Sequence, residues 1–312
     1  MMLSVLPYFL LLVLLIPGSI HTALAADSVV PKAPVTVQDK DIVKAEALRK
    51  KGDYRQAILY YKKGLVSSRK KFGRESLYVA AIYHHVGLAY AADKNTDRAL
   101  ANMLLSLEIK LKHLHPEHPA LANDYNNLGF VYKMNRDYTK ALEYLKLAQL
   151  LKLNRYGILH PEIAAGYLNV GVVYKSKKDY KRALHYYRKA LEIANKTLPP
   201  GHFYLISVYH NLGVAHYEQG NLKKSIGFFQ RAIALELKNK KLNAARVAIQ
   251  CDYLGQAYQK LGDHQRAVKY FKIALNMQLV RFGKSHPQTK ASLDKLLAAK
   301  KLAASPGSTL GR

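Results

Sequence analysis

The sequence has few of the residues and motifs that covalent or catalytic chemistry needs. Its 312 residues include one cysteine, Cys251, and no tryptophan, so no internal disulfide can form and an exported fold has to rest on packing alone. The sequence contains no HExxH, CxxC or GxSxG motif, and Gly283-Lys284-Ser285 lacks the upstream glycine of a phosphate-binding loop. We therefore expect a protein that is not an enzyme and that uses no cofactor and no metal ion.

Acidic residues are also scarce. Lys and Arg number 49 against 21 Asp and Glu, which gives a formal net charge of +28. Such an excess favours anionic partners, which include acidic peptides, anionic lipid or glycan surfaces and nucleic acid. The alternative is a well-solvated basic surface without a partner, because charge alone does not identify what a protein binds. Of the anionic partners, nucleic acid is the one we least expect.

No charged residue occurs in the first 25 residues. An apolar run from Val5 to Ile16 is too short to span a bilayer, and Ala23-Leu24-Ala25 provides the small residues that signal peptidase accepts. Residues 1–25 are therefore predicted to be a secretory signal peptide, which would deliver the mature chain to the periplasm or the exterior without a transmembrane span. The alternative is an N-terminal membrane anchor that is not cleaved.

What the sequence does have is a repeat of 42 residues. The stretch NNLGFVYKMNRDYTKALEYLKLA at residues 126–148 returns as LNVGVVYKSKKDYKRALHYYRKA at residues 168–190. We call the glycine position of this stretch the anchor, and at steps of 42 it holds Ala45, Gly87, Gly129, Gly171, Gly213 and Gly255. Small residues also recur 12 and 19 positions after the anchor, and an aromatic residue recurs three positions after it in most units. Columns of this kind are the signature of a repeat array.

The columns describe a helical hairpin. Small residues at the anchor and 12 positions later allow two helices to cross closely. Asp53, Asp137 and Asp179 follow short polar turns, where an aspartate can cap the second helix of its unit. A single hairpin cannot bury its apolar faces, so successive hairpins are expected to stack.

The order of small and aromatic residues resembles the tetratricopeptide repeat. The 42-residue period, the His-Pro pairs that begin at His118, His160 and His286, and Asn-Asn-Leu-Gly at residues 126–129 make it similar to the kinesin-light-chain type of this repeat. The resemblance implies an all-α fold, a right-handed superhelical solenoid of about six helical hairpins with a C-terminal capping helix. It also implies a protein that binds other proteins rather than one that catalyses a reaction.

The period sets the expected boundaries. The expected segments are, in order, a mobile linker (26–38), the solenoid (39–302) and a disordered tail (303–312). The expected hairpins are 39–76, 77–118, 119–160, 161–202, 203–244 and 245–286, followed by the cap at 287–302. The first hairpin departs from the pattern with Ala45 and Leu48, and the fifth with His216 and Ser225, so we expect less regular packing in both.

Two further features have structural explanations. His113, His115 and His118 lie close together in HLHPEH, but the repeat already places His118 in the linker between two hairpins. We therefore expect no metal site at these histidines. Cys251 occupies a column that otherwise holds tyrosine, so we expect a packed core residue rather than a nucleophile.

The resemblance also implies where a partner binds. In tetratricopeptide repeat proteins the first helices line a concave groove, into which the residue two positions before the anchor points. The predicted groove residues are His85, Asn127, Asn169 and Asn211 two before the anchor, Leu88, Phe130, Val172 and Val214 one after it, and Lys133 and Lys175 four after it. The asparagines can bond to the backbone of an extended peptide, and the lysines favour an acidic one. The alternative is that the asparagines only bond to neighbouring helices.

Two functional hypotheses follow. The first is an exported, non-catalytic interaction protein that holds a peptide or protein segment in its groove. The second is a binder of anionic envelope lipid, glycan or nucleic acid that uses a basic outer surface, for which a solvated outer face is the alternative. The basic residues of that surface include Arg69, Lys70, Lys71, Lys181, Arg182, Arg188, Lys189, Lys223, Lys224, Lys238, Lys240 and Lys241. The sequence leaves the identity of the partner and the oligomeric state open.

Export gives a testable prediction. Cleavage by signal peptidase after Ala25 or Ala26 leaves a mature chain that begins at Ala26 or Asp27. N-terminal sequencing of the protein purified from its natural host measures this directly. An intact Met1 on protein recovered from the cytosol would contradict the prediction.

Overall fold

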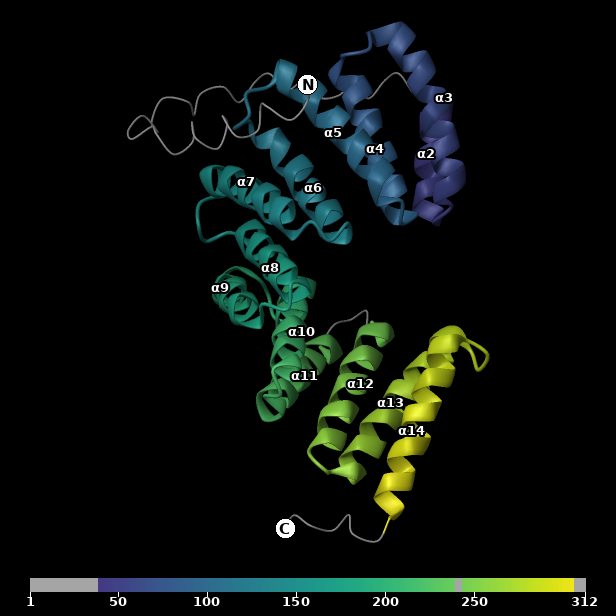
Figure 1. Ribbon diagram of the computed structural model, residues 1–312, viewed down its shortest axis with the longest axis vertical. Coiled ribbons are helices and arrows are strands. Elements are labelled where there is room, and N and C mark those ends of the chain that lie inside the picture. Colours follow the sequence, from purple (N-terminus) through teal and green to yellow (C-terminus); the bar gives the residue numbers. More distant parts are fainter. Residues whose placement is uncertain (1–38, 239–242, 306–312) are drawn as a thin grey trace.

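The computed structural model describes residues 39–238 and 243–305, and the chain in these ranges is almost entirely α-helical (Figure 1). No β-strand occurs in them, in agreement with the all-α prediction. None of their helices is both long and apolar enough to cross a bilayer. The predicted signal peptide, the predicted linker and residues 306–312 of the predicted tail lie outside the described ranges, as do Lys240 and Lys241.

Within the described ranges, twelve helices form six hairpins and a thirteenth follows them. The pairs are α2 (Lys40–Lys51) with α3 (Tyr54–Phe72), α4 (Leu77–Ala92) with α5 (Thr96–His113), α6 (Ala122–Met134) with α7 (Tyr138–Tyr156), α8 (Pro161–Ser176) with α9 (Tyr180–Thr197), α10 (Phe203–Glu218) with α11 (Leu222–Leu237), and α12 (Ala244–Lys260) with α13 (His264–Phe282). A 3₁₀ turn, η1 (Pro119–Leu121), precedes α6, and α14 (Pro287–Ala304) is the final helix. Each helix packs against the next, so the hairpins stack into a curved solenoid (Figure 1). The prediction of six hairpins and a final helix is confirmed.

Five of the six hairpins have a close contact at an anchor glycine, and the first has Ala45 there. A Cβ atom added to Gly171 would lie 2.4 Å from Cε1 of Tyr187, whose ring comes from the second helix of the same hairpin. The same position of the second helix, 16 residues after the anchor, meets every other anchor glycine: Met103 at Gly87, Leu145 at Gly129, Phe229 at Gly213 and Phe271 at Gly255. The anchor is glycine because this large side chain fills the space that a β-carbon would need.

The turn inside each hairpin repeats one local structure. Five second helices begin after a residue whose side chain accepts a hydrogen bond from the backbone N–H three positions later, namely Asp53, Asn95, Asp137, Asp179 and Asp263. The three aspartate caps predicted from the sequence are among them. The residue before each of these five caps has a positive φ, between 61° and 84°, which reverses the chain between the helices.

Stacked rings join the two helices of a hairpin beside the anchor. In the fourth hairpin Tyr174 stacks on Tyr186 with ring centroids 5.4 Å apart. In the fifth hairpin His216 stacks on Phe228 at 5.3 Å, and the Ser225 hydroxyl donates to a first-helix carbonyl at 2.8 Å. The fifth hairpin thus keeps the ring pair, because a planar imidazole replaces the tyrosine ring, but its turn is less regular, since Asn221 makes no side-chain hydrogen bond to the start of α11. The first hairpin does differ, since α2 has 12 residues and no ring in this column.

After four of the linkers, a histidine caps the start of the next helical segment. These residues are His118, His160, His202 and His286, and in each the imidazole Nδ1 accepts from the backbone N–H two positions later at 3.2 Å. In three of the four the next residue is proline, whose missing N–H is not needed in the first turn of a helix. The His-Pro pairs of the sequence are thus helix starts.

The final helix covers the last hairpin with one face only. Ser292, Leu296 and Ala299 are buried, and α14 packs against α13. Leu297, which occupies a seventh anchor position, is 54% exposed because no second helix among the described residues covers it. The helix continues to Ala304, beyond the predicted end of the cap at residue 302, so the start of the predicted tail is helical.

The contact at the anchor predicts a large effect for Gly171→Leu. The added side chain has to displace the fully buried Tyr187 ring, and we expect the free energy of unfolding to fall by roughly 1–3 kcal/mol or more. The matched control is Gly227→Ala in α11, where nothing lies within 4 Å of an added Cβ. Alanine there should stabilise the helix by about 0.5–1 kcal/mol. Urea unfolding followed by circular dichroism measures both, and equal midpoints for Gly171→Leu and the wild type would contradict the packing argument.

Candidate binding groove

The first helices form the inner wall of the solenoid. Successive units approach through their first helices, α4 with α6, α8 with α10 and α10 with α12, whereas no pair of second helices in the described part of the chain approaches to the same extent. Helices on the inside of a curved array lie closer together, so the first helices face its concave side (Figure 1). All of the predicted groove residues lie on α4, α6, α8 and α10.

Polar side chains link each first helix to the next. The Asn127 amide donates to His84 Nε2 at 3.2 Å, and the Asn169 amide donates to Asn126 Oδ1 at 2.9 Å. Both contacts join residues that are 43 positions apart. In each contact the asparagine lies two positions before its anchor, and its partner lies three positions before the anchor of the preceding unit. Asn127 and Asn169 therefore join neighbouring first helices, as the alternative interpretation expects, through their amide N–H groups. Asn127 and Asn169 each keep an Oδ1 atom that accepts from no other described side chain.

The contacts change toward the C-terminus. The residue 43 positions before Asn211 is Leu168, which has no polar group, and Asn211 accepts instead from Lys175 Nζ at 2.8 Å. At the last step Lys295 of α14 binds the Asp252 carboxylate at 2.7 Å. The sequence analysis did not predict a role for the residues three positions before the anchor. These residues lie 43 positions before the asparagines of the next unit, and stacking of the first helices brings the two positions together.

A pair of lysines lies on the inner wall without an acidic partner. Lys133 and Lys175 are half-buried, and among the described residues neither forms an ion pair. Burial lowers the pKa of both ammonium groups, and the charge of Lys133 lowers the pKa of Lys175 further, while the charge of Glu218 opposes that shift. Lys133 Nζ lies 4.4 Å from the centre of the Phe130 ring. We call Lys133 and Lys175 the cationic pair.

Aromatic rings continue the wall beyond Lys175. The rings of His210 and Tyr253 lie with their centroids 6.0 Å apart, and Tyr217 packs edge-on against Tyr253 at 5.6 Å. Burial, together with the charge of Lys175, lowers the pKa of His210 to about 4. His210 is therefore neutral at neutral pH and adds no further positive charge beside the cationic pair.

The predicted apolar strip is only partly a surface. Phe130 is 51% exposed, and Leu88 and Val172 are half-buried. Val214 is only 6% exposed because it packs in a core cluster with Phe229. The prediction of Val214 as a groove residue is therefore wrong, and the exposed strip ends before the fifth hairpin.

His85 lies at the N-terminal end of the wall. Its ring stacks on Tyr61 with centroids 6.1 Å apart, and its Nδ1 lies 3.4 Å from Glu46 Oε1. Burial lowers the pKa of His85, and the charge of Glu46 acts in the opposite direction. The Tyr61 hydroxyl also donates to Glu46, so His85 belongs to a polar cluster that joins α4 to the first hairpin.

A buried carboxylate supports the wall between the second and third hairpins. Asp124 is 4% exposed, both of its oxygens accept from Lys110 Nζ at 2.7 Å, and Oδ1 lies 2.8 Å from His84 Nδ1. Burial acts to raise the pKa of Asp124, but the hydrogen bond from His84 and the charge of Lys110 outweigh it and hold this pKa below its ordinary value. Since His84 also binds Asn127, these four side chains form one connected chain.

The remaining candidates have structural roles. In residues 39–238 and 243–305 no group of three or more His, Cys, Asp or Glu side chains could hold a metal ion. His113 Nε2 lies 2.6 Å from the carbonyl oxygen of Glu75, while His115 and His118 accept from nearby backbone N–H groups. Cys251 is buried, and burial raises the pKa of its thiol to about 12, so this cysteine is not a thiolate at neutral pH.

Comparison with protein families agrees with the architecture. Three family models, each described as a tetratricopeptide repeat, match residues 78–149 and 162–236, residues 254–279, and residues 43–75. These matches fall on all six hairpins. No curated protein matches the chain by sequence.

Solved structures share the fold at low sequence identity. BtubC (BKLC) from P. vanneervenii aligns with a TM-score of 0.62 and 21% identity, over 75% of this chain and 94% of its own. A putative kinesin light chain of Podosopora anserina with nearly identical TPR-like repeats aligns with a TM-score of 0.56 and 19% identity, over 65% of this chain and 96% of its own. The apo form of the quorum sensor NprR from B. thuringiensis aligns with a TM-score of 0.65 and 15% identity, over 86% and 71% of the two chains.

The buried carboxylate predicts a pH-dependent effect for Asp124→Asn. The variant leaves the Lys110 ammonium without its partner, and we expect the free energy of unfolding at neutral pH to fall by roughly 1.5–3 kcal/mol. Because the pKa of Asp124 is lowered in the folded state, the wild type has this contribution above the ordinary carboxyl pKa and loses it as the pH falls through the lowered value. The difference between the two proteins should therefore shrink in acid.

Urea unfolding of both proteins at about pH 7 and about pH 3 measures this difference. The matched control is Glu108→Gln, which removes an exposed carboxylate from the same helix as Lys110 and should change stability little at either pH. A constant difference between Asp124→Asn and the wild type at all pH values would show that the Asp124 charge is not what stabilises the wall.

Proposed function

Because the chain belongs to the tetratricopeptide repeat family, we propose that it is a non-catalytic scaffold that binds a peptide or protein segment along its inner wall. Proteins built from stacked helical repeats use the concave surface of the array for binding. We also propose that the mature chain works outside the cytosol, which is supported by the sequence of residues 1–25.

The observation that supports an acidic partner is the cationic pair. Within the described part of the chain these two half-buried ammonium groups have lost part of their hydration and have gained no ion pair in return, as the lowered pKa of each reflects. A carboxylate of a bound segment would supply the missing charge to both. This preference for negative charge is local to the third and fourth hairpins, and it does not depend on the net charge of the whole chain.

The surroundings of the cationic pair suit an extended segment. The free Oδ1 atoms of Asn127 and Asn169 can accept hydrogen bonds from backbone N–H groups of a bound chain. Phe130 is half exposed beside Lys133 and offers an apolar contact for a side chain. Acceptors, an apolar ring and two cations on successive first helices therefore match a short acidic peptide with at least one apolar residue.

Peptide selection tests this proposal even though the natural partner is unidentified. Random 12-residue peptides displayed on phage are selected against the wild-type chain, and we expect the enriched sequences to contain Asp or Glu. The affinity of an enriched synthetic peptide is then measured by fluorescence anisotropy for Lys133→Gln/Lys175→Gln. Each lost charge-assisted contact should weaken binding roughly tenfold.

The matched control is Lys223→Gln/Lys224→Gln, which removes the same charge from exposed positions on the second helix α11. We expect this control to bind the peptide like the wild type. Retained binding by the groove variant together with loss in the α11 control would move the site to the outer surface and overturn the proposal. Circular dichroism confirms that both variants keep the helical fold.

A further inference from the structure

The loop that joins α7 to α8, residues 157–160, exposes aliphatic side chains to solvent. Ile158 and Leu159 are adjacent and are 58% and 61% exposed, and Leu153 and Tyr156 at the end of α7 are 38% and 40% exposed. From this loop we propose that the chain has a second binding surface, which inserts into the interface of an anionic lipid bilayer. This surface is separate from the groove and does not depend on the function proposed for it.

The repeat does not require these aliphatic residues. At the positions equivalent to Ile158-Leu159 four of the five other linkers have Arg74-Glu75, Pro116-Glu117, Pro200-Gly201 and Lys284-Ser285, and the fifth has one aliphatic residue, in Leu242-Asn243. A polar or small pair is therefore sufficient to connect two hairpins in this fold. Since Ile158 and Leu159 bury little surface within the chain, packing does not explain them, and an exposed apolar patch of this kind indicates an interaction site.

The loop lies at the outside of the solenoid, and a second linker lies next to it. Figure 1 shows the α7–α8 connection as an arc at the outer margin of the array, away from the concave side. The starts of α8 and α10 share one core cluster that contains Ile163 and Leu205, so the linkers before these helices are neighbours. Phe203, the first residue of α10 after that linker, is 49% exposed. Leu153, Tyr156, Ile158, Leu159 and Phe203 are called the loop patch below.

The charges around the loop patch favour a negatively charged surface. The Arg155 guanidinium lies 5.3 Å from the centre of the Tyr156 ring and forms no ion pair among the described residues, while Lys196 at the end of α9 pairs with Glu192 at 3.1 Å. The nearby carboxylate of Glu162 is paired with Lys152 at 2.8 Å. Basic groups next to exposed aliphatic and aromatic residues are typical of segments that bind the interface of anionic membranes.

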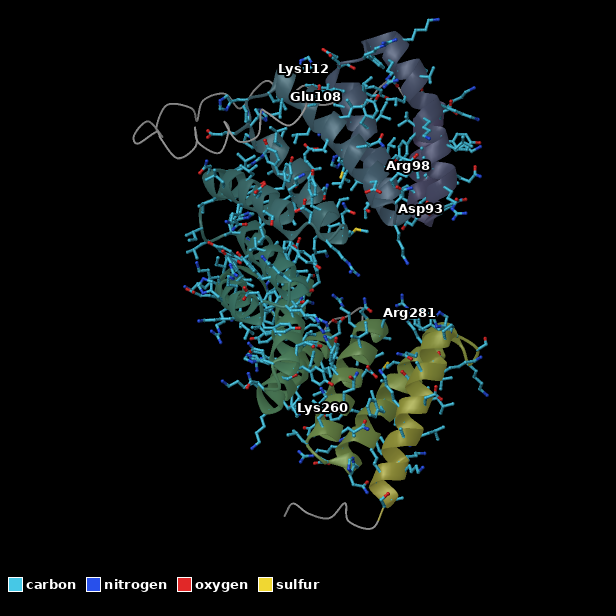
Figure 2. All side chains as sticks on the ribbon, viewed as in Figure 1. Asp93, Arg98, Glu108, Lys112, Lys260 and Arg281 are labelled. Carbon is cyan, nitrogen blue, oxygen red and sulfur yellow. The ribbon has the colours of Figure 1, made fainter. Side chains whose placement is uncertain are left out.

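Charge alone does not single out this loop, because basic side chains occur at both ends of the hairpins. Figure 2 shows Lys112 and Arg281 where second helices end and Arg98 and Lys260 beside the turns. What distinguishes the α7–α8 loop is the combination of basic groups with aliphatic side chains on a convex connection. A bilayer interface needs no matching pocket, because it takes up exposed apolar side chains that are flanked by basic groups.

The absence of tryptophan makes insertion directly measurable. In Leu159→Trp the new indole is the only one in the chain, so its fluorescence reports on the loop alone. The probe is a vesicle that contains phosphatidylglycerol, and the comparison is a vesicle of phosphatidylcholine alone. We expect the emission of Leu159→Trp to shift to shorter wavelength with the anionic vesicles, and to shift little with the neutral ones.

The matched control is Val66→Trp, which places the only indole at a 70% exposed position on α3. Its emission should not shift with either vesicle. An unchanged emission of Leu159→Trp with both vesicles would overturn the proposal. Equal shifts in both variants would mean that the whole chain adsorbs through its charge, and this result would also overturn insertion of the loop.

A second pair of variants tests the same surface without tryptophan. Ile158→Ser/Leu159→Ser should weaken co-sedimentation with phosphatidylglycerol vesicles about tenfold. Leu59→Ser/Val66→Ser removes two exposed aliphatic side chains from α3 and should sediment like the wild type. Equal sedimentation of the two variants would contradict the proposal, and recovery of an acidic protein rather than lipid through the loop patch would replace the bilayer with a protein partner.

Discussion

The close crossing of two helices at the anchor is the constraint on which the rest of the structure depends. A large side chain from the second helix occupies the place of a β-carbon at Gly87, Gly129, Gly171, Gly213 and Gly255. Once the two helices are locked there, the ring pairs beside the anchor and the left-handed turn residues follow at fixed offsets. The hairpin is then a rigid unit, and its neighbours can stack with one geometry. The inner wall exists because six such units present their first helices in the same direction.

Part of the large positive charge is structural. Basic residues 11 positions after the anchor lie over the aromatic residue three positions after it, as Arg182 does over Tyr174 at 5.0 Å and Lys140 over Tyr132 at 5.4 Å. Arg182 also pairs with the capping residue Asp179 of its own helix. Such residues stabilise the hairpin and need no external partner. The net charge is therefore a poor guide to anionic ligands. A binding site is better indicated by a basic side chain that has no ion pair within the described residues.

Periodicity was sufficient to predict the hairpins, because the contacts that close them lie within one unit at constant spacing. The caps at Asp53, Asp137 and Asp179 were predictable for the same reason. Contacts between units were not predictable in detail, since they depend on how far each first helix is turned toward the next. The burial of Val214 and the bond between Asn169 and Asn126 are two such details. The α7–α8 loop departs from the other linkers in sequence, because it alone has two adjacent aliphatic residues at these positions, and this departure indicates its exposure.

The two proposed surfaces belong to different parts of the repeat, so substitutions in them are expected to affect the fold differently. Groove residues lie on first helices, where Asn127, Asn169 and Lys175 also make contacts between units, so a change of these residues risks the curvature of the array. The α7–α8 loop lies between hairpins and contributes little buried surface, so its sequence can vary without cost to the fold. An array attached to a bilayer through Ile158 and Leu159 would keep the cationic pair free, because the pair faces the concave side. Attachment and capture of a partner could then operate at the same time.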